Sequence, residues 1–271
     1  MNKLSGVLIN NRSRIRKWTN WLLYAIFGAY ILFLIVTTPH PITKLVYGLI
    51  GLIVLSIILL FEWLTLLYQK MIFALTMACD HQKARHLRNK LKRFDYFKGF
   101  GPSLKLFDAL LLLDEGDYQA CLNHLDQHHH FFHGTTDYLL INYRTMLQCA
   151  YFLTNRPLFD DALKKIKQLK YGVQSNKALS PLYSWEEIQG LQFFRQGRYS
   201  QSLKTLKKVN TTRFNTREVT YLLFEQAQAL HASNNLSEAH RLLEDVSKQG
   251  NQLHIVTLAK NKEWMTFEKY E

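Results

Sequence analysis

The chain has 271 residues and a formal net charge of +13. Residues 1–17 hold five cations and no acid, residues 70–101 hold eight cations and two acids, and the remaining residues are nearly balanced. Because the excess cations flank apolar runs, they indicate membrane topology and lipid contact, and they argue against a groove that binds nucleic acid.

Two apolar runs follow the basic N-terminal residues 1–17, one over residues 18–36 and one over residues 45–61. Each is long enough to cross a hydrocarbon core of about 30 Å as a helix that rises about 1.5 Å per residue. The connection, residues 37–44, contains two prolines and one charge. We therefore expect a transmembrane helical hairpin over residues 18–68.

The cations predict the orientation of this hairpin. Many more precede the first run and follow the second than lie between them, so both termini are expected to be cytoplasmic. We expect a multi-pass protein of a plasma membrane of the bacterial type. The basic residues expected to contact anionic lipids are Arg12, Arg14, Arg16, Lys17, Arg85, Arg88 and Lys92. The alternative for the three that follow the hairpin, Arg85, Arg88 and Lys92, is that they form a basic face in contact with water.

The second run has no clear end, because residues 63–79 stay apolar and contain neither Gly nor Pro. This pattern predicts one long helix over residues 45–78 that leaves the membrane. Glu62 is expected to reach the interface or to pair with Lys70 or with an arginine of the first helix, and an ion or ligand contact is the alternative. Residues 69–101 then form juxtamembrane basic helices or a degenerate first repeat.

Small residues recur through residues 102–271 at a spacing of twelve, and each pair encloses a turn. A large aliphatic residue follows the second member of each pair by four positions. Two antiparallel helices that cross closely need a small side chain on each at the contact, so the pattern predicts repeated helix pairs. The pairs are Ala109 with Cys121, Ala150 with Ala162, Gly190 with Ser202, and Ala227 with Ala239.

Residues 62–271 resemble the tetratricopeptide repeat family, whose Gly-x-Tyr turn is matched at Gly116-Asp117-Tyr118 and Gly197-Arg198-Tyr199. The resemblance implies an all-α chain, in which the transmembrane hairpin precedes an α-solenoid of about four to five helix pairs. A hairpin followed by such repeats also loosely resembles the HemY family, including the segment Phe61-Glu62-Trp63-Leu64. We carry no function over from that second resemblance.

In helical repeats the first helix of each pair lines a concave face, where partners bind. We therefore expect a groove rich in aromatic residues and poor in charge that takes a protein segment with apolar or aromatic side chains. Its predicted residues are Arg144, Tyr151, Glu187, Phe194, Tyr221, Phe224 and Gln228. The alternative is that several of these aromatic residues pack between repeats as core.

Five histidines cluster in residues 124–133, and His124 and His128 have the i,i+4 spacing that lets two rings face one metal ion. A solvent-facing helix end is the alternative interpretation. The three cysteines follow no metal-ligand spacing and are expected to be free thiols. The sequence contains no phosphate loop, nucleophile elbow or dinucleotide motif, so we expect neither an enzyme nor a bound cofactor.

These features favour a membrane-anchored cytoplasmic scaffold or adaptor that binds a protein partner and anionic lipid, and that does not bind nucleic acid. A metal- or haem-handling membrane protein that uses the histidine cluster is the alternative. Gly28, Gly48 and Gly51 would let the two spans pack closely, and they leave self-association open.

Overall fold

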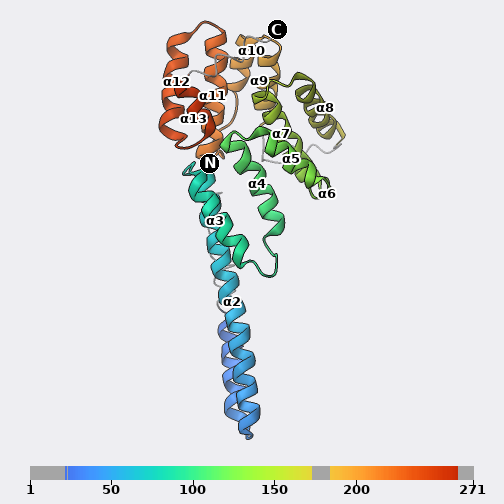
Figure 1. The fold of residues 1–271 in the computed structure, drawn as a ribbon, viewed down its shortest axis with the longest axis vertical. Coiled ribbons are helices and arrows are strands. Elements are labelled where there is room, and N and C mark those ends of the chain that lie inside the picture. The colour runs from blue at the N-terminus through green and yellow to red at the C-terminus, as the bar shows by residue number, and fades with distance from the viewer. Residues whose placement is uncertain (1–21, 23, 173–183, 262–271) are drawn as a thin grey trace, which may run out of the picture. The chain divides into compact units, whose positions relative to one another are not determined.

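Figure 1 shows the computed structural model of the protein, which describes residues 22, 24–172 and 184–261. Every regular element in these described residues is a helix. The chain divides into two units, Met1–Thr65 and Leu66–Glu271, and helix α2 (Pro41–Thr76) contains the boundary between them. The prediction that the fold is all-α is confirmed.

Helix α2 is the long helix that the sequence predicts over residues 45–78. It begins four residues earlier, at Pro41, because the fixed φ of proline suits the first helical position and its missing N–H costs nothing there. Its apolar window has a mean hydropathy of 2.5, and none of that window is buried. Within the described residues α2 is long and apolar enough to span a membrane, and the shorter helix Tyr24–Thr37 is also apolar.

Two contacts join the helices of the first unit. A side chain added at Gly51 would lie 2.9 Å from Cγ2 of Ile31, so the backbone of α2 passes close to the helix Tyr24–Thr37 at that point. The Tyr24 hydroxyl donates a hydrogen bond of 3.2 Å to Glu62 Oε1. The Tyr24 hydroxyl is thus one partner of the Glu62 carboxylate. No ion pair joins Glu62 to Lys70 among the described residues, and the arginines that precede the first span lie outside them.

The second unit continues with helices that pack in sequential pairs, α4 on α5, α7 on α8, α9 on α10 and α11 on α12. The short helix α6 packs on α7, and the short helix α13 packs on α12. The bounds are α3 (His81–Phe94), α4 (Gly101–Glu115), α5 (Tyr118–Gln127), α6 (His129–Phe132), α7 (Thr136–Phe152), α8 (Arg156–Gly172), α9 (Trp185–Arg195), α10 (Tyr199–Leu206), α11 (Thr216–Ala232), α12 (Leu236–Gln249) and α13 (His254–Asn261).

All four turns expected from the sequence lie between the two helices of a pair. The turn after α4 shows why its residues are needed. Gly116 ends the helix in the left-handed region, with φ of 81°, and its N–H bonds back to the last turn of α4. A Cβ at Gly116 would lie 2.3 Å from the His254 ring, and the Asp117 side chain caps α5 by accepting from Ala120 N. A larger residue at Gly116 would meet both backbone strain and a clash.

The small residues of the twelve-residue spacing lie where paired helices cross, and all eight are buried. The Ser202 hydroxyl donates to the Gly190 carbonyl at 2.7 Å, and the Cys121 thiol donates to the Ala109 carbonyl at 3.3 Å. These bonds from a side chain of one helix to the backbone of the other require close approach, which larger residues would prevent.

Leucine in place of Ala150 or Ala227 is expected to lower the free energy of unfolding by about 1–3 kcal/mol each, because both alanines are fully buried at a helix crossing and added methyl groups must displace neighbours. The measurement is thermal unfolding of the full chain in detergent, followed by circular dichroism. Gln201→Leu, an exposed change on α10, is the control. Wild-type melting in both alanine variants would contradict the close crossing.

Candidate functional site

Six of the seven predicted groove residues are buried, and Phe194 is partly buried. Arg144 and Tyr221 are each only 2% exposed, so a partner cannot contact them as the chain is folded. The aromatic residues pack on one another instead: the ring centroids of Tyr151 and Phe194 lie 5.8 Å apart, and those of Phe152 and Tyr221 lie 6.3 Å apart. The expectation of an open groove at these residues is corrected, because they form the core between helices.

Arg144 on α7, Glu187 on α9 and Glu225 on α11 form a buried charged group, which we call the Glu225 cluster. The Arg144 guanidinium donates to the Glu187 carboxylate. The pKa of Glu225 lies well above its ordinary value, first because burial disfavours its charged form and then because Glu187 repels that charge, while Arg144 acts in the opposite direction. Arg144 is thus paired with Glu187, and its positive charge also acts on the Glu225 carboxyl.

Asp114 on α4 and Arg217 and Tyr221 on α11 form a second buried polar group, which we call the Asp114 cluster. Nε of Arg217 donates to both carboxylate oxygens of Asp114, at 2.8 and 2.7 Å, and the Tyr221 hydroxyl donates to Oδ1 at 3.0 Å. Burial raises the pKa of Asp114 in spite of these three contacts. The cluster joins helices more than 100 residues apart in sequence, so its role is to hold α11 to α4.

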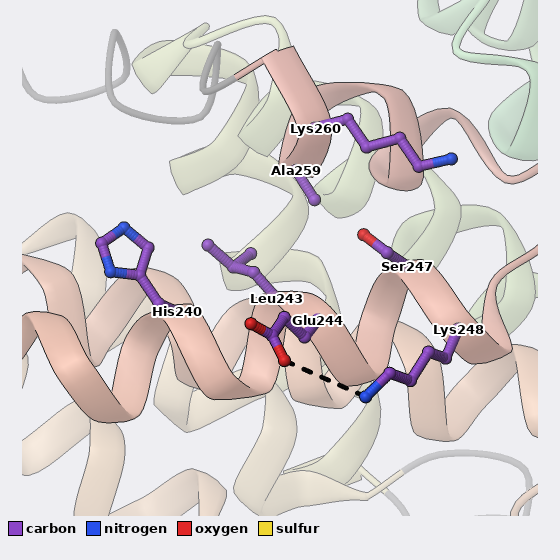
Figure 2. Close-up of a pocket in the computed structure, with 7 residues that line it drawn as sticks. All are labelled: His240, Leu243, Glu244, Ser247, Lys248, Ala259 and Lys260. Atoms are coloured by element: carbon purple, nitrogen blue, oxygen red, sulfur yellow. Dashed lines mark ion pairs between the residues drawn. The ribbon is translucent and has the colours of Figure 1, made fainter.

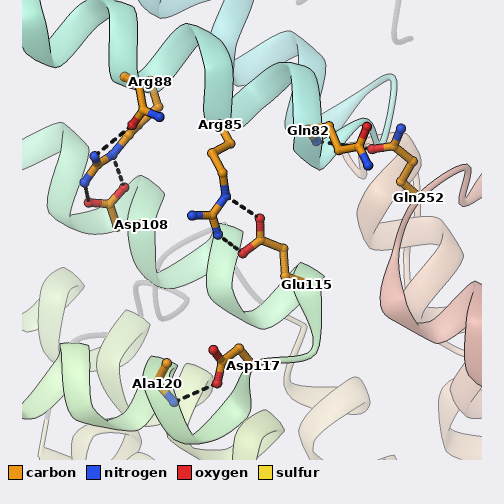
Figure 3. Close-up of polar contacts among 9 residues, drawn as sticks. Gln82, Arg85, Arg88, Asp108, Glu115, Asp117, Ala120 and Gln252 are labelled. Atoms are coloured by element: carbon orange, nitrogen blue, oxygen red, sulfur yellow. Dashed lines mark hydrogen bonds and ion pairs between the residues drawn. The ribbon is translucent and has the colours of Figure 1, made fainter.

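Two of the arginines expected to contact lipid are bonded to acids of α4 (Figure 3). Arg85 Nε donates to Glu115 at 2.8 Å, and Arg88 Nε donates to Asp108 at 2.8 Å. These contacts fix α3 against α4, while the Arg85 side chain stays 52% exposed, so its contact with headgroups remains a prediction. Lys92 is exposed on the last turn of α3. The other predicted lipid contacts, Arg12, Arg14, Arg16 and Lys17, lie outside the described residues.

The histidine cluster lies at the end of α5 and around α6. The rings of His124 and His128 are neighbours, with centroids 4.7 Å apart, but Nε2 of His124 lies 2.9 Å from the Lys105 carbonyl oxygen. Burial is the first cause that lowers the pKa of both His128 and His133. Within residues 24–172 and 184–261, no three His, Cys, Asp or Glu side chains are arranged to hold a metal ion.

The three cysteines are free and buried, as the prediction of free thiols requires. Burial raises the pKa of Cys79 to about 11. Because the thiolate is the nucleophilic form of cysteine, the raised pKa keeps this thiol protonated and weakly nucleophilic at neutral pH.

A pocket of about 530 Å³ between α12 and α13 was not anticipated from the sequence (Figure 2). Leu243 and Ala259 form its apolar floor, and exposed polar side chains, among them the ion pair of Glu244 with Lys248 at 3.9 Å, form its rim. The amphipathic pattern of α12 places Leu243 on a buried face, but no sequence signal indicates that α13 leaves space there. The lining residues are His240, Leu243, Glu244, Ser247, Lys248, Ala259 and Lys260.

No family model, curated protein or solved structure matches this chain. Its architecture and its candidate sites therefore rest on its own residues.

Proposed function

We propose that the chain is a membrane-anchored, non-catalytic interaction protein. In this proposal residues 18–68 form a transmembrane helical hairpin in a bacterial-type plasma membrane, both termini are cytoplasmic, and residues 102–271 form a tetratricopeptide-like solenoid that binds a protein partner. One observation carries the proposal. A helix whose apolar window is completely exposed continues into a unit of paired helices that cross at buried small residues.

The pocket between α12 and α13 is the proposed contact surface for the partner. Its apolar floor suits one aliphatic or aromatic side chain of a protein segment, and its charged rim suits the backbone and polar neighbours of that segment. This assignment replaces the predicted groove, whose residues are buried. Metal or haem handling by the histidine cluster stays the alternative prediction, although no three metal-binding side chains gather there among the described residues.

Site-specific photocrosslinking in native membranes tests this function. We place a photoreactive phenylalanine derivative at Lys248, on the rim of the pocket, and at Arg241 as the matched control. Both are exposed cations on α12, and Arg241 does not line the pocket. The expected result is a discrete adduct with another protein at position 248, weak or absent at position 241, that stays in the membrane pellet after alkaline extraction.

Three outcomes would contradict the proposal. Equal adducts at both positions would show random encounters, and an adduct between two copies of the chain would show self-association at this pocket. Release of the protein by alkaline extraction would mean that α2 does not anchor it.

A further inference from the structure

The loop between α3 and α4, residues 95–100, presents two aromatic side chains to the surroundings. Tyr96 is 70% exposed and Phe97 is 73% exposed, more than any other large apolar residue described between positions 66 and 261. Exposure of so much apolar surface to water is unfavourable, so we expect another surface to contact this pair.

This loop, which we call the aromatic loop, is held in a defined shape. The Asp95 carboxylate accepts hydrogen bonds of 2.9 Å from the backbone N–H groups of Gly99 and Phe100. Lys98 adopts the left-handed conformation, with φ of 53°, and its N–H donates to the Asp95 carbonyl at 3.1 Å. Because the backbone bonds close the loop on itself, Tyr96 and Phe97 are presented without a further cost in ordering the loop.

Exposed cations lie on both sides of the aromatic pair in the sequence. Lys92 and Arg93 lie on the last turn of α3, and Lys98 lies in the loop itself. Asp95 is the acid of the loop, and its carboxylate is already occupied by the two backbone N–H groups. Aromatic side chains among cations are the combination that favours the headgroup region of an anionic bilayer.

The position of the loop along α2 indicates which surface covers it. The ring of Phe100 lies 5.5 Å from the ring of Tyr68, centroid to centroid. Tyr68 follows the apolar run of α2 and precedes Lys70, and a tyrosine followed by a cation is typical of the membrane–water interface. The loop therefore lies beside the part of α2 that is expected at the headgroup level.

We propose that the aromatic loop inserts Tyr96 and Phe97 into the headgroup region of an anionic bilayer, while Lys92, Arg93 and Lys98 contact lipid phosphates. The inference rests on the proposed function only in requiring that α2 is anchored in the membrane. The surface is separate from the pocket between α12 and α13, so lipid contact and partner binding are tested independently.

Spin labelling of the full chain tests the proposal. The protein is reconstituted into vesicles of equal parts phosphatidylglycerol and phosphatidylcholine, with a nitroxide attached at Phe97→Cys or, as control, at Arg241→Cys. The native cysteines are buried, which limits labelling elsewhere. The measured quantity is the ratio of the nitroxide's collision rate with oxygen to its collision rate with a water-soluble nickel complex. We expect this ratio to be at least about twofold higher at position 97 than at position 241, because oxygen partitions into lipid.

The charge requirement is tested by Lys92→Gln, Arg93→Gln and Lys98→Gln in the chain labelled at position 97. These changes, or vesicles of phosphatidylcholine alone, are expected to move the collision ratio towards that of position 241, since the attraction to anionic lipid is lost. Circular dichroism should remain that of the wild type, because all three side chains are exposed.

Two results would overturn the lipid assignment. A ratio at position 97 equal to that at position 241 would place the loop in water, and shielding from both oxygen and nickel would mean that protein covers it. Alkaline extraction is the accompanying measurement. If the chain stays in the membrane in either case, the anchor holds and only the lipid contact of the loop is wrong; if the chain is released, the membrane anchor itself is wrong.

Discussion

Replacing Asp114 with Asn is expected to lower the free energy of unfolding by about 3–5 kcal/mol, the cost of leaving one charge of a buried ion pair uncompensated. The Arg217 guanidinium would remain in the interior between α4 and α11, facing a neutral amide. The measurement is thermal unfolding of the full chain in detergent at neutral pH. For a unit of this size the loss corresponds to a fall in melting temperature of about 2–4 °C per kcal/mol.

The double variant Asp114→Asn with Arg217→Met is the matched control. The asparagine oxygen can still accept the hydrogen bond from Tyr221, and the buried cation is gone, so most of the stability should return. If the double variant melts no higher than Asp114→Asn, the loss comes from packing or from the Tyr221 contact and not from the charge of Arg217.

The helix pairs could be predicted because their determinants are local. A turn is encoded by the residues that form it, as at Gly116, whose positive φ and closeness to His254 require the absence of a side chain. The small residues at crossings recur at a spacing of twelve, which one sequence displays directly. The long helix α2 was predictable for the same reason, since an apolar run without Gly or Pro indicates a continuous helix.

The candidate site was less predictable, because exposure depends on what packs against a residue. Tyr151 stands at a position expected to face a groove, yet its hydroxyl donates to Gln228 of α11 at 2.7 Å and its ring contacts Phe194 of α9. Both partners lie more than 40 positions away in sequence. Periodicity identifies the face of α7 that holds Tyr151, but it does not distinguish a concave surface from the core between neighbouring helices.

The basic helix α3 shows the same limit for charged residues. Its six cations give a uniform positive pattern in the sequence, but Arg85 and Arg88 find Glu115 and Asp108 on the next helix. The packing of α3 on α4 decides which of these cations are paired, and the sequence pattern does not show it. Lys92 remains exposed at the end of the helix, near the aromatic loop.

Replacing Arg144 with Met is expected to lower the free energy of unfolding by about 3–5 kcal/mol at about pH 7.5, because Glu187 loses its buried ion pair and Glu225 loses a nearby positive charge. The loss should depend on pH. The pKa of Glu225 in the folded chain lies above its ordinary value of 4.5, so between the two values the folded state holds a proton that the unfolded state releases. Stability therefore falls as pH rises through this window and returns as pH is lowered.

Removing Arg144 widens that window, because the guanidinium opposes the upward shift of the pKa of Glu225. The stability of Arg144→Met should therefore approach that of the wild type as the pH is lowered from about 8 to about 5. The difference in the free energy of unfolding should change by at most about 1.4 kcal/mol per pH unit for one proton. Adding Glu187→Gln and Glu225→Gln should restore most of the stability and flatten the profile. A loss of equal size at both pH values would mean that the methylene stem of Arg144, and not its charge, holds α7 against α9 and α11.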